Sequence, residues 1–462
     1  MKNSRSEKRY AVAELFCGCG GFSHGFAMTG KFDVVFGNDV KGAALTTFRE
    51  NHDGALGKPK FINRDIREVK ISEILDALRE KGIEKGELDC LIGGPPCQGF
   101  SRMRRSEERE DGEIVRFGGY DHLSEDPRND LVLRFLEVAQ ELRPRFIVIE
   151  NVPQMLTHGF NGVPGGLGSA IRRILEDDME YAVDIDVLDA ANYGVPQTRE
   201  RVIILASRDG SASLPGHTHE NPDSVGLLKP WVTVEDAIGD LPPPSMINDE
   251  LGGNSINLYG NDPSVYACEL RSKHHFPYNH VRRSYSKSVI DIIEEMRSGE
   301  TWESASERMQ LLYATLLEEY CMPGEDREMA LARLAEQGLI NPVFYKKYYW
   351  SAYTRLAWKA PALTITANAN FLGSGRFTHP EENRGITVRE AARLQSFEDD
   401  FRIITSEDDA SDTENINVGL DMIGEAVPPL LGKAIALHIL SLMEEEDYTE
   451  ETDAIVRVPE LS

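Results

Sequence analysis

The first 207 residues alternate short apolar runs with segments of helical periodicity, and this alternation most constrains the fold. The apolar runs are residues 11–16, 32–36, 88–92, 145–150, 182–188 and 202–206. Such alternation is typical of βα units, in which consecutive strands lie parallel in one sheet and the helices cover it. We therefore expect an α/β fold with a doubly wound, mostly parallel sheet.

The regular alternation ends near residue 207, and a different kind of sequence follows. Proline-rich loops are mixed there with helical segments, one near 288–296 and others within 303–337. An apolar run returns at 361–366, before helices expected at 388–395 and 429–443. We expect four parts: the sheet domain at 1–207, a small irregular domain at 208–355, a return to the sheet domain at 356–443, and an acidic tail at 444–462.

Charge is distributed unevenly along the chain. The net charge is −27, which argues against unspecific attraction to nucleic acids or anionic membranes. Acid is concentrated at 398–414 and 444–460, which we interpret as a solvated loop and a solvated tail. The stretch 271–287 carries five Lys or Arg, three His and no acid. It could contact an anionic partner, or it could be a solvated face of the protein.

Composition also bears on the compartment. The first nine residues are polar, and we find no uninterrupted apolar run near 18 residues, so neither a secretory leader nor a membrane span is expected. Six cysteines in 462 residues, without a Cys-x-x-Cys pair, do not form a disulfide framework. We expect no metal site, no membrane partner and a cytoplasmic, reducing setting.

A cysteine follows the apolar run 88–92 on a rigid turn, in the sequence Gly-Gly-Pro-Pro-Cys-Gln-Gly-Phe-Ser over 93–101. Proline fixes φ, so Cys97 is held in one direction at the carboxyl edge of the sheet, where α/β folds place ligands. A cysteine used for packing would lie within the strand, as Cys90 does. The turn favours a reactive thiol at Cys97 over a buried structural one.

A glycine-rich turn follows the first strand, at Phe16-Cys17-Gly18-Cys19-Gly20-Gly21. Glycines in a first βα turn let a cofactor approach the backbone, although a plain tight turn has the same composition. Asp39 ends the second strand, where a carboxylate would meet ribose hydroxyls, and Asp65 with Ile66 follows the third, where a carboxylate would accept from an adenine amino group. Either aspartate alone could be an ordinary turn residue.

Two further groups are expected at the same edge. Glu150 ends the strand at 145–150, which we place beside the strand that leads to Cys97. Arg199 and Arg201 are spaced by two residues on an extended segment, so their side chains point the same way. A surface ion pair with Glu200 or another acid is the alternative for these arginines.

In this order the segments resemble the DNA (cytosine-5) methyltransferases of prokaryotic type. The resemblance covers roughly 1–205 and 355–440, and the stretch between corresponds to the target-recognition domain of that family. The matching segments are Phe16 to Gly21, Asp39, Asp65-Ile66, Pro95 to Gln98, Arg128 to Leu131, Glu150 to Val152, Gln197 to Arg201, Arg389 to Phe397 and Gly424 to Pro429. Two positions depart from the family pattern: Glu398 stands where proline is usual, and Glu425 where asparagine is usual.

The resemblance implies a Rossmann-like methyltransferase fold, S-adenosyl-L-methionine as cofactor, and methyl transfer to carbon 5 of a flipped-out cytosine. Cys97 would add to carbon 6 of the base, Glu150 would bind ring nitrogen 3, and Arg199 and Arg201 would hold the base and orient Glu150. The cofactor would be bound by Phe16, Gly18, Gly20, Gly21, Asp39, Asp65, Ile66 and Pro95.

The resemblance also implies double-stranded DNA as the partner of a monomeric enzyme, with a cognate restriction or defence system. A mobile loop over 98–120 would close on DNA. The DNA-binding residues would be Gln98, Ser101, Arg102, Arg104, Gln197, Arg282 and Arg283. The aromatic and basic stretch 344–353 suits DNA contact as well, but we favour core packing for it.

Two other functions use the same residues. The machinery could methylate a cytosine in RNA, which a comparison of methyl transfer to duplex DNA and to transfer RNA would reveal. The chain could also be a DNA-binding relative without activity. The presence of Cys97, Glu150 and Arg199 together argues against that alternative.

Overall fold

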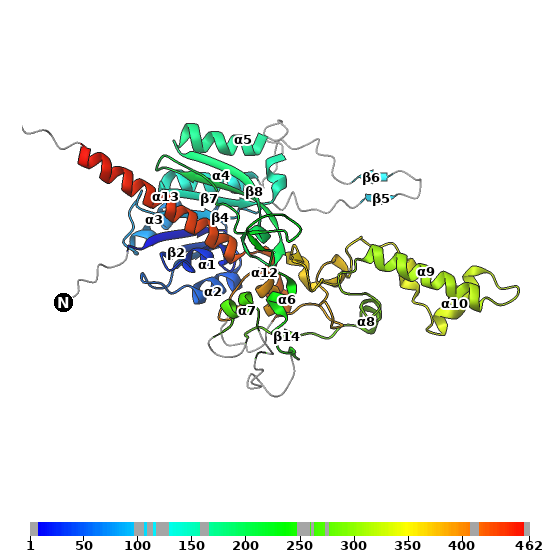
Figure 1. The fold of residues 1–462 in the computed structure, drawn as a ribbon. Coiled ribbons are helices and arrows are strands. Elements are labelled where there is room, and N and C mark those ends of the chain that lie inside the picture. The colour runs from blue at the N-terminus through cyan, green and yellow to red at the C-terminus, as the bar shows by residue number, and fades with distance from the viewer. Residues whose placement is uncertain are drawn as a thin grey trace, which may run out of the picture. The chain divides into compact units, whose positions relative to one another are not determined.

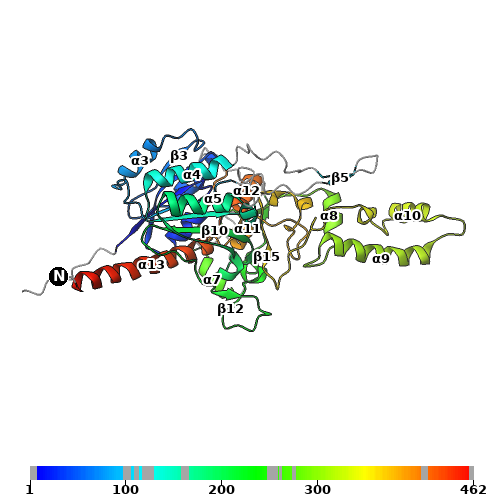
Figure 2. The ribbon, with the colours of Figure 1, turned by 90° about the horizontal axis from the view of Figure 1, so that it is seen from above.

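The computed structural model describes residues 8–96, 106–108, 114–116, 129–157, 166–246, 259, 263–272, 277–406 and 415–456. The chain divides into two compact units (Figures 1 and 2). Unit 1 comprises Met1–Tyr193, Arg199–Thr218 and Ala426–Ser462, and unit 2 comprises Gly194–Thr198 and His219–Glu425.

Unit 1 is built on one seven-stranded sheet with the strand order β3-β2-β1-β4-β7-β10-β8. All neighbouring pairs are parallel except those of β10, which runs antiparallel to both β7 and β8. The expected mostly parallel α/β sheet is therefore confirmed. The strands are β1 (Tyr10–Leu15), β2 (Phe32–Asp39), β3 (Lys60–Asn63), β4 (Cys90–Gly93), β7 (Phe146–Asn151), β8 (Ala182–Asp189) and β10 (Glu200–Ser207).

The helices of unit 1 follow the strands as the sequence pattern predicts (Figure 1). Apolar side chains of α3, α4 and α5 form one large buried core with residues of β1, β4, β7 and β10. Helix α13 continues to Val456, well beyond the expected end at 443, so much of the acidic tail is helical. The helices are α1 (Gly21–Ala27), α2 (Gly42–Asn51), α3 (Ile71–Arg79), α4 (Asn129–Leu142), α5 (Gly166–Arg173) and α13 (Pro429–Val456).

The order of the sheet determines where a ligand can bind. Strands β2 and β3 extend from one side of β1, whereas β4 and β7 extend from the other side. The direction of the strand order thus reverses between β1 and β4, and open α/β sheets bind ligands outside the carboxyl ends of the strands at such a point. Strand β10 begins at this same edge because Val202 pairs with Asn151 in the antiparallel register.

Helices α1 and α13 cross at two glycines. A Cβ atom on Gly25 would lie 2.3 Å from the carbonyl oxygen of Pro429, and one on Gly432 would lie 2.8 Å from the carbonyl oxygen of Phe22. Real Cβ atoms do not approach backbone so closely, so the two backbones touch only because both positions lack a side chain. This contact holds the last helix of the chain against the first.

Unit 2 has little regular sheet, in agreement with the irregular domain expected after residue 207. Its strands are two residues long and pair in short ladders, among them β15 (Ala362–Leu363) with β9 (Gln197–Thr198) and β13 (Ser245–Met246) with β14 (Val281–Arg282). Its helices are α6 (Val234–Ile238), α7 (Val265–Leu270), α8 (Lys287–Ile293), α9 (Trp302–Tyr320), α10 (Arg327–Glu336), α11 (Val388–Leu394) and α12 (Ile416–Glu425).

The division of the chain differs from the expected boundaries. Residues 356–425, expected to rejoin the sheet domain, belong to unit 2, and residues 208–218 belong to unit 1. The cause is a network around the buried Arg393 side chain of α11. Its guanidinium contacts both carboxylate oxygens of Asp399 at 2.6 Å and also Asp240 at 3.1 Å, which ties the late segment to the early part of unit 2.

The same network corrects our interpretation of the acidic stretch 398–414 as a solvated loop at Asp399, whereas residues 407–414 lie outside the described part of the chain. Asp399 is fully buried, and it accepts a hydrogen bond from the Tyr259 hydroxyl in addition to those from Arg393. Asp400 accepts a hydrogen bond from Ser272. Removing one member of such a buried pair is strongly destabilising because it leaves the other charge uncompensated.

One helical stretch, Ile416–Glu444, is long and apolar enough to cross a membrane, but 61% of its apolar window is buried within the structure. It consists of two helices, α12 and the first part of α13, separated at residues 426–428. A buried, interrupted stretch of this kind is what the core helices of a folded domain show.

We predict that Gly25→Ala lowers the free energy of unfolding by about 1–3 kcal/mol, the usual cost of overpacking, because the methyl group would push α1 away from α13. Urea unfolding of the full chain measures this change.

The matched control is Gly216→Ala. A Cβ atom at Gly216 meets nothing within 4 Å, so this variant should unfold like the parent. Equal stability of the two variants would show that the crossing of α1 and α13 has more room than the structure indicates.

Candidate active site

The glycine-rich loop after β1 is held by the carboxylate of Asp39 at the end of β2. The backbone N–H of Gly18 donates to Asp39 Oδ2 at 2.8 Å, and that of Lys41 donates to Oδ1 at 2.9 Å. Phe16, Gly18 and Gly20 have φ angles of +56°, +52° and +87°. Such angles are uncommon for a residue with a Cβ atom, so the strain at Phe16 indicates a loop shaped for a purpose other than stability.

Gly18 and Gly20 are needed in this loop for different reasons. A Cβ atom on Gly20 would lie 2.6 Å from the rings of both Phe48 and His52, so this side of the loop is packed. A Cβ atom on Gly18 would meet nothing within 4 Å. Gly18 therefore presents bare backbone to open space, which fits the close approach of a cofactor. Gly21 is the first residue of α1 and is buried.

The neutral imidazole ring of His52 packs against the loop at Gly20. Burial, with a smaller effect from His24, lowers the pKa of His52 to about 3. Its Nδ1 lies 2.7 Å from the carbonyl oxygen of Phe48, so Nδ1 carries the single proton and donates it. The His52 ring therefore fills the space beside Gly20 without introducing a charge.

Glu14, near the end of β1, is a second buried residue, after His52, that stabilises this region and was not evident from the sequence. Its carboxyl group is buried, and Oε2 accepts a hydrogen bond of 3.2 Å from the backbone N–H of Ser23 in α1. Burial, with a smaller effect from the charge of Asp39, raises the pKa of Glu14 to about 8. Glu14 is therefore protonated at neutral pH and links β1 to the helix that follows the loop.

The third predicted cofactor position lies after β3. Asp65 is partly exposed, and its carboxylate pairs with Arg67 at 2.5 Å, which lowers the pKa of Asp65 through the side-chain hydrogen bond. The Ile66 side chain belongs to the buried core of unit 1. Phe16 of the loop after β1 packs against the core that contains Ile66, and the role of Asp65 and Ile66 in binding adenine stays a prediction.

The end of β4 and the turn that follows it are closely packed at two glycines. A Cβ atom on Gly93 would lie 2.5 Å from the carbonyl oxygen of Leu15, and one on Gly94 would lie 3.0 Å from Glu150 Oε2. The Asn151 side chain donates from Nδ2 to the carbonyl oxygen of Pro95 at 2.9 Å. The end of β7 thus anchors the backbone that leads directly to Cys97.

Glu150 and Arg201 form an ion pair at this edge, with Arg201 Nε 2.8 Å from Glu150 Oε1. Both side chains are largely buried, at 14% exposed for Arg201 and 11% for Glu150. Arg201 does not pair with the carboxylate of Glu200, since its contact with that residue is a hydrogen bond from Nη1 to the backbone carbonyl oxygen. The second carboxylate oxygen of Glu150, Oε2, lies on the side of Gly94.

Arg199 is buried beside this pair. Burial and the neighbouring Arg201 charge lower the pKa of Arg199 well below its ordinary value, while Glu150 opposes the shift. The backbone N–H of Arg199 donates to Asp189 Oδ1 at 2.9 Å, which fixes the start of β10. The structure therefore brings Glu150, Arg199 and Arg201 together, as the sequence predicts.

Gln197, predicted to contact DNA, is fully buried in unit 2. Its Nε2 donates to the carbonyl oxygen of Leu394, and its Oε1 accepts from the N–H of Ile365 at 2.8 Å. Both polar ends of the side chain are thus engaged in packing. A direct contact between Gln197 and DNA would require this packing to change.

Three of the basic residues in the stretch 271–287 bind within unit 2, and residues 273–276 lie outside the described part of the chain. Arg271 pairs with Asp240 at 2.7 Å, and His280 is buried between Thr387 and Pro242. Arg283 donates to Asn417 and to the carbonyl oxygen of Asn370. Arg282 is exposed, so of the two arginines predicted to bind DNA it is the more accessible.

Several predicted residues lie outside the described part of the chain, so their placement remains open. They are Cys97, Gln98, Ser101, Arg102 and Arg104. Within the loop expected over 98–120, Ser106–Glu108 and Ile114–Arg116 form an antiparallel pair of strands, β5 and β6.

The two departures from the family pattern are explained only in part. Glu425 is exposed at the end of α12, whereas a Cβ atom on Gly424 would lie 2.2 Å from the Thr366 carbonyl carbon. The glycine is thus required by packing, and the glutamate beside it is not buried. Glu398 contributes its carbonyl oxygen to Arg389 at 2.8 Å, a contact that does not depend on its side chain.

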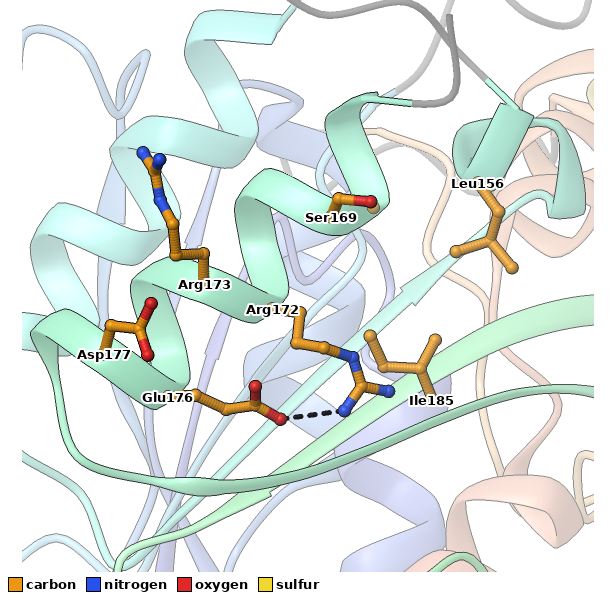
Figure 3. A pocket seen from close by; sticks show the side chains of 8 residues that line it. Leu156, Ser169, Arg172, Arg173, Glu176, Asp177 and Ile185 are labelled. Carbon is orange, nitrogen blue, oxygen red and sulfur yellow. Dashed lines mark hydrogen bonds and ion pairs between the residues drawn. The ribbon is translucent and has the colours of Figure 1, made fainter.

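A hollow of about 390 Å³ lies between α5 and β8, on the edge strand of the sheet (Figure 3). Arg172 and Glu176 pair with each other there at 2.8 Å. None of the predicted site residues lines this hollow, so we do not regard it as the active site. Its lining is Leu156, Gly168, Ser169, Arg172, Arg173, Glu176, Asp177 and Ile185.

Comparison with known proteins agrees with this geometry. Residues 10–441 match the family described as C-5 cytosine-specific DNA methylase. Type II methyltransferase M.AgeI of Thalassovita gelatinovora is 30% identical, and the alignment covers 92% of this chain and 97% of that protein. Type II methyltransferase M.DdeI of Desulfomicrobium norvegicum is 25% identical over 96% of this chain and 92% of that protein.

Similarities also extend to a eukaryotic protein and to a solved structure. DNA (cytosine-5)-methyltransferase 1 of the mouse is 27% identical over 92% of this chain, which spans 28% of that protein. A structure described as a candidate prophage DNA modification methyltransferase (E. coli) shares the fold, with a TM-score of 0.59 and 21% identity, over 94% of this chain and 99% of that one.

We predict that Glu14 makes the protein less stable as pH rises from about 5 to 8. The unfolded chain ionises this carboxyl group above its ordinary pKa of 4.5, whereas the folded chain keeps it protonated up to about pH 8. The free energy of unfolding therefore falls with pH in this window, by up to about 1.4 kcal/mol per pH unit.

Glu14→Gln should remove that part of the slope, because glutamine keeps the shape and does not ionise. Urea unfolding of parent and variant at pH 5, 6, 7 and 8 measures it. Parallel slopes in the two proteins would contradict the raised pKa of Glu14.

Proposed function

Because the chain belongs to the C-5 cytosine-specific DNA methylase family, we propose that it methylates carbon 5 of cytosine within a specific sequence of double-stranded DNA. It is a DNA (cytosine-5) methyltransferase by its match to this family over residues 10–441. The observation that carries the proposal is the ion pair between Glu150 and Arg201, held beside the turn that leads to Cys97.

The residues at the carboxyl ends of β1 and β2 fit S-adenosyl-L-methionine. Gly18 leaves open space beside its backbone, and the Asp39 carboxylate stands at the strand end where ribose hydroxyls would be bound. When bound, S-adenosyl-L-methionine would supply an activated methyl group on sulfur. Phe16, Gly20 and Gly21 would shape the loop around it, Pro95 would close the site, and Asp65 with Ile66 would border the adenine.

Cys97 would act as the nucleophile toward the base. Carbon 5 of cytosine is a weak nucleophile until a thiolate adds to carbon 6 and shifts electron density to it. Asn151 holds the carbonyl of Pro95, so the backbone two residues before Cys97 is fixed against the end of β7. After methyl transfer, loss of the proton from carbon 5 and departure of the thiolate would restore the aromatic ring.

Glu150 would bind ring nitrogen 3 of the cytosine and assist the addition at carbon 6. Arg201 occupies its Oε1, which fixes the plane of the carboxylate and leaves Oε2 on the side of Gly94. The buried Arg199 guanidinium adds positive charge beside this pair. Arg201 and Arg199 would thus orient Glu150 and polarise the base.

The setting of the reaction is part of the proposal. Relatives named as type II methyltransferases support a role in a restriction–modification or phage-defence system. We propose that the enzyme acts as a monomer on DNA in the cytoplasm. The target cytosine would be flipped out of the duplex, since the reacting carbons are not accessible within the stack.

The experiment that tests the function measures transfer of tritiated methyl groups to unmethylated plasmid DNA and to transfer RNA. Transfer to DNA, followed by mapping of 5-methylcytosine at a recurring sequence, supports the proposal and identifies the site. Transfer to transfer RNA alone would overturn it.

We predict that Cys97→Ser abolishes methyl transfer, because a serine hydroxyl does not supply the thiolate. Duplex DNA with 5-fluorocytosine at the mapped site should form a covalent adduct with the parent and not with the variant, as seen on denaturing gels. The matched control is Cys268→Ser, which changes an exposed cysteine and should retain both activity and the adduct. An adduct with Cys97→Ser would refute the assignment.

We predict that Asp39→Ala weakens binding of S-adenosyl-L-methionine by about 1–3 kcal/mol, the range for losing a hydrogen bond to a charged group. Calorimetric titration measures the change. Asp53→Ala, an exposed aspartate near the end of α2, should bind like the parent. Unchanged affinity of Asp39→Ala would remove Asp39 from the cofactor site.

A further inference from the structure

Unit 2 exposes five consecutive residues, Lys346-Lys347-Tyr348-Tyr349-Trp350, after a 3₁₀ turn at Pro342–Tyr345. The three aromatic side chains are 41%, 45% and 42% exposed. Three neighbouring aromatic residues are rarely left this open to water without a use. We call residues 346–350, together with Arg376, the aromatic–basic surface.

The core of unit 2 holds this segment at both ends. Phe344 is fully buried and stacks on Trp302 at 5.1 Å, and Tyr353 contacts the same indole at 5.8 Å. The ring of Tyr348 lies edge-on to Trp302 at 4.8 Å. The stretch for which we favoured core packing is therefore divided: its two ends are core, and its middle is surface.

Backbone strain is concentrated beside the exposed residues. Tyr353 and Arg376 have φ angles of +55° and +64°, values that residues with a Cβ atom rarely adopt. Gly375, at +108°, packs so closely that a Cβ atom would lie 2.4 Å from the Ser351 carbonyl oxygen. Strain of this kind persists where the surrounding structure imposes it, and it is common at ligand-binding sites.

The strained backbone at Gly375 and Arg376 places the Arg376 guanidinium over the exposed ring of Trp350, 5.4 Å from its centroid. The cation is thus fixed at the surface on an aromatic face. Lys346 and Lys347 are exposed, and neither takes part in an ion pair with any residue that the structure describes. Arg271 and Arg283 of the predicted basic stretch, in contrast, bind within unit 2.

This combination of groups points to one class of partner. Available lysine and arginine charges attract phosphates, and exposed aromatic rings pack against the sugars and base edges of a duplex groove. The surface belongs to a protein of net charge −27, so positive charge left without carboxylate partners here is unlike the chain as a whole. An acidic protein partner would match the charges but would not require three open aromatic rings.

We propose that the aromatic–basic surface binds the substrate DNA, with Lys346 and Lys347 on phosphates and Trp350 against a base or sugar. This inference rests on the proposed function, and it assigns DNA binding to residues outside the basic stretch 271–287. Arg376 acts as a positioning residue, since it holds the Trp350 ring in place.

The test measures the affinity of the full chain for 30-base-pair duplexes that contain the mapped target site, over a range of salt concentrations. For Lys346→Ala with Lys347→Ala, the slope of log affinity against log salt should decrease in magnitude by about 1.8, or 0.9 for each phosphate that the protein no longer neutralises. Trp350→Leu should bind about 10-fold more weakly with an unchanged slope, and Trp350→Phe should retain most of the affinity.

Tyr320→Leu is the matched control, because Tyr320 is 48% exposed at the end of α9 in the same unit and should have no effect. Calorimetric binding of S-adenosyl-L-methionine, unchanged in every variant, establishes that unit 1 is folded, and an unchanged urea unfolding curve establishes the same for the full chain.

Two negative outcomes are distinguishable. If the parent methylates and binds DNA while the lysine and Trp350 variants keep its slope and affinity, the aromatic–basic surface does not bind DNA and the proposed function stands. If the parent neither binds nor methylates duplex DNA, the proposed function fails, and this inference fails with it.

Discussion

The parallel pairing of β2, β1, β4 and β7 is the constraint on which the site depends. Parallel strands end at the same edge of a sheet, so Asp39, the loop at 16–20, the turn at 94–96 and Glu150 are brought to one edge although they are far apart in sequence. Strand β10 runs antiparallel to the others, so its first residues lie at this edge. Arg201, near the start of β10, therefore reaches Glu150 at the end of β7.

Glycines and buried polar groups convert this edge into a defined geometry. At Gly93 and Gly94 a Cβ atom would touch backbone or Glu150, and at Gly20 it would touch His52 and Phe48. Glu14 and His52 support the loop in their neutral forms, because burial opposes the charged form of each. These two supports add no charge to the loop, so the charge that holds it is the carboxylate of Asp39.

Unit 2 uses its charges in two different ways. Arg389 and Arg393 are buried and bind carbonyl groups or carboxylates, so they determine how distant segments of a domain with little sheet pack together. Lys346, Lys347 and Arg376 lie at the surface beside open aromatic rings. Net charge alone does not reveal this difference, because it counts buried and exposed groups equally.

The sequence alone determined the sheet class, the positions of six of the seven strands of the main sheet, and the edge where Asp39, Glu150 and Arg201 lie, since these follow from local periodicity and strand ends. Only the tertiary structure decided that residues 356–425 pack in unit 2, that Gln197 and Asp399 are buried, and that Glu14 and His52 support the cofactor loop. Each of these depends on contacts between residues distant in sequence, and burial in such contacts has no local pattern from which it could be predicted.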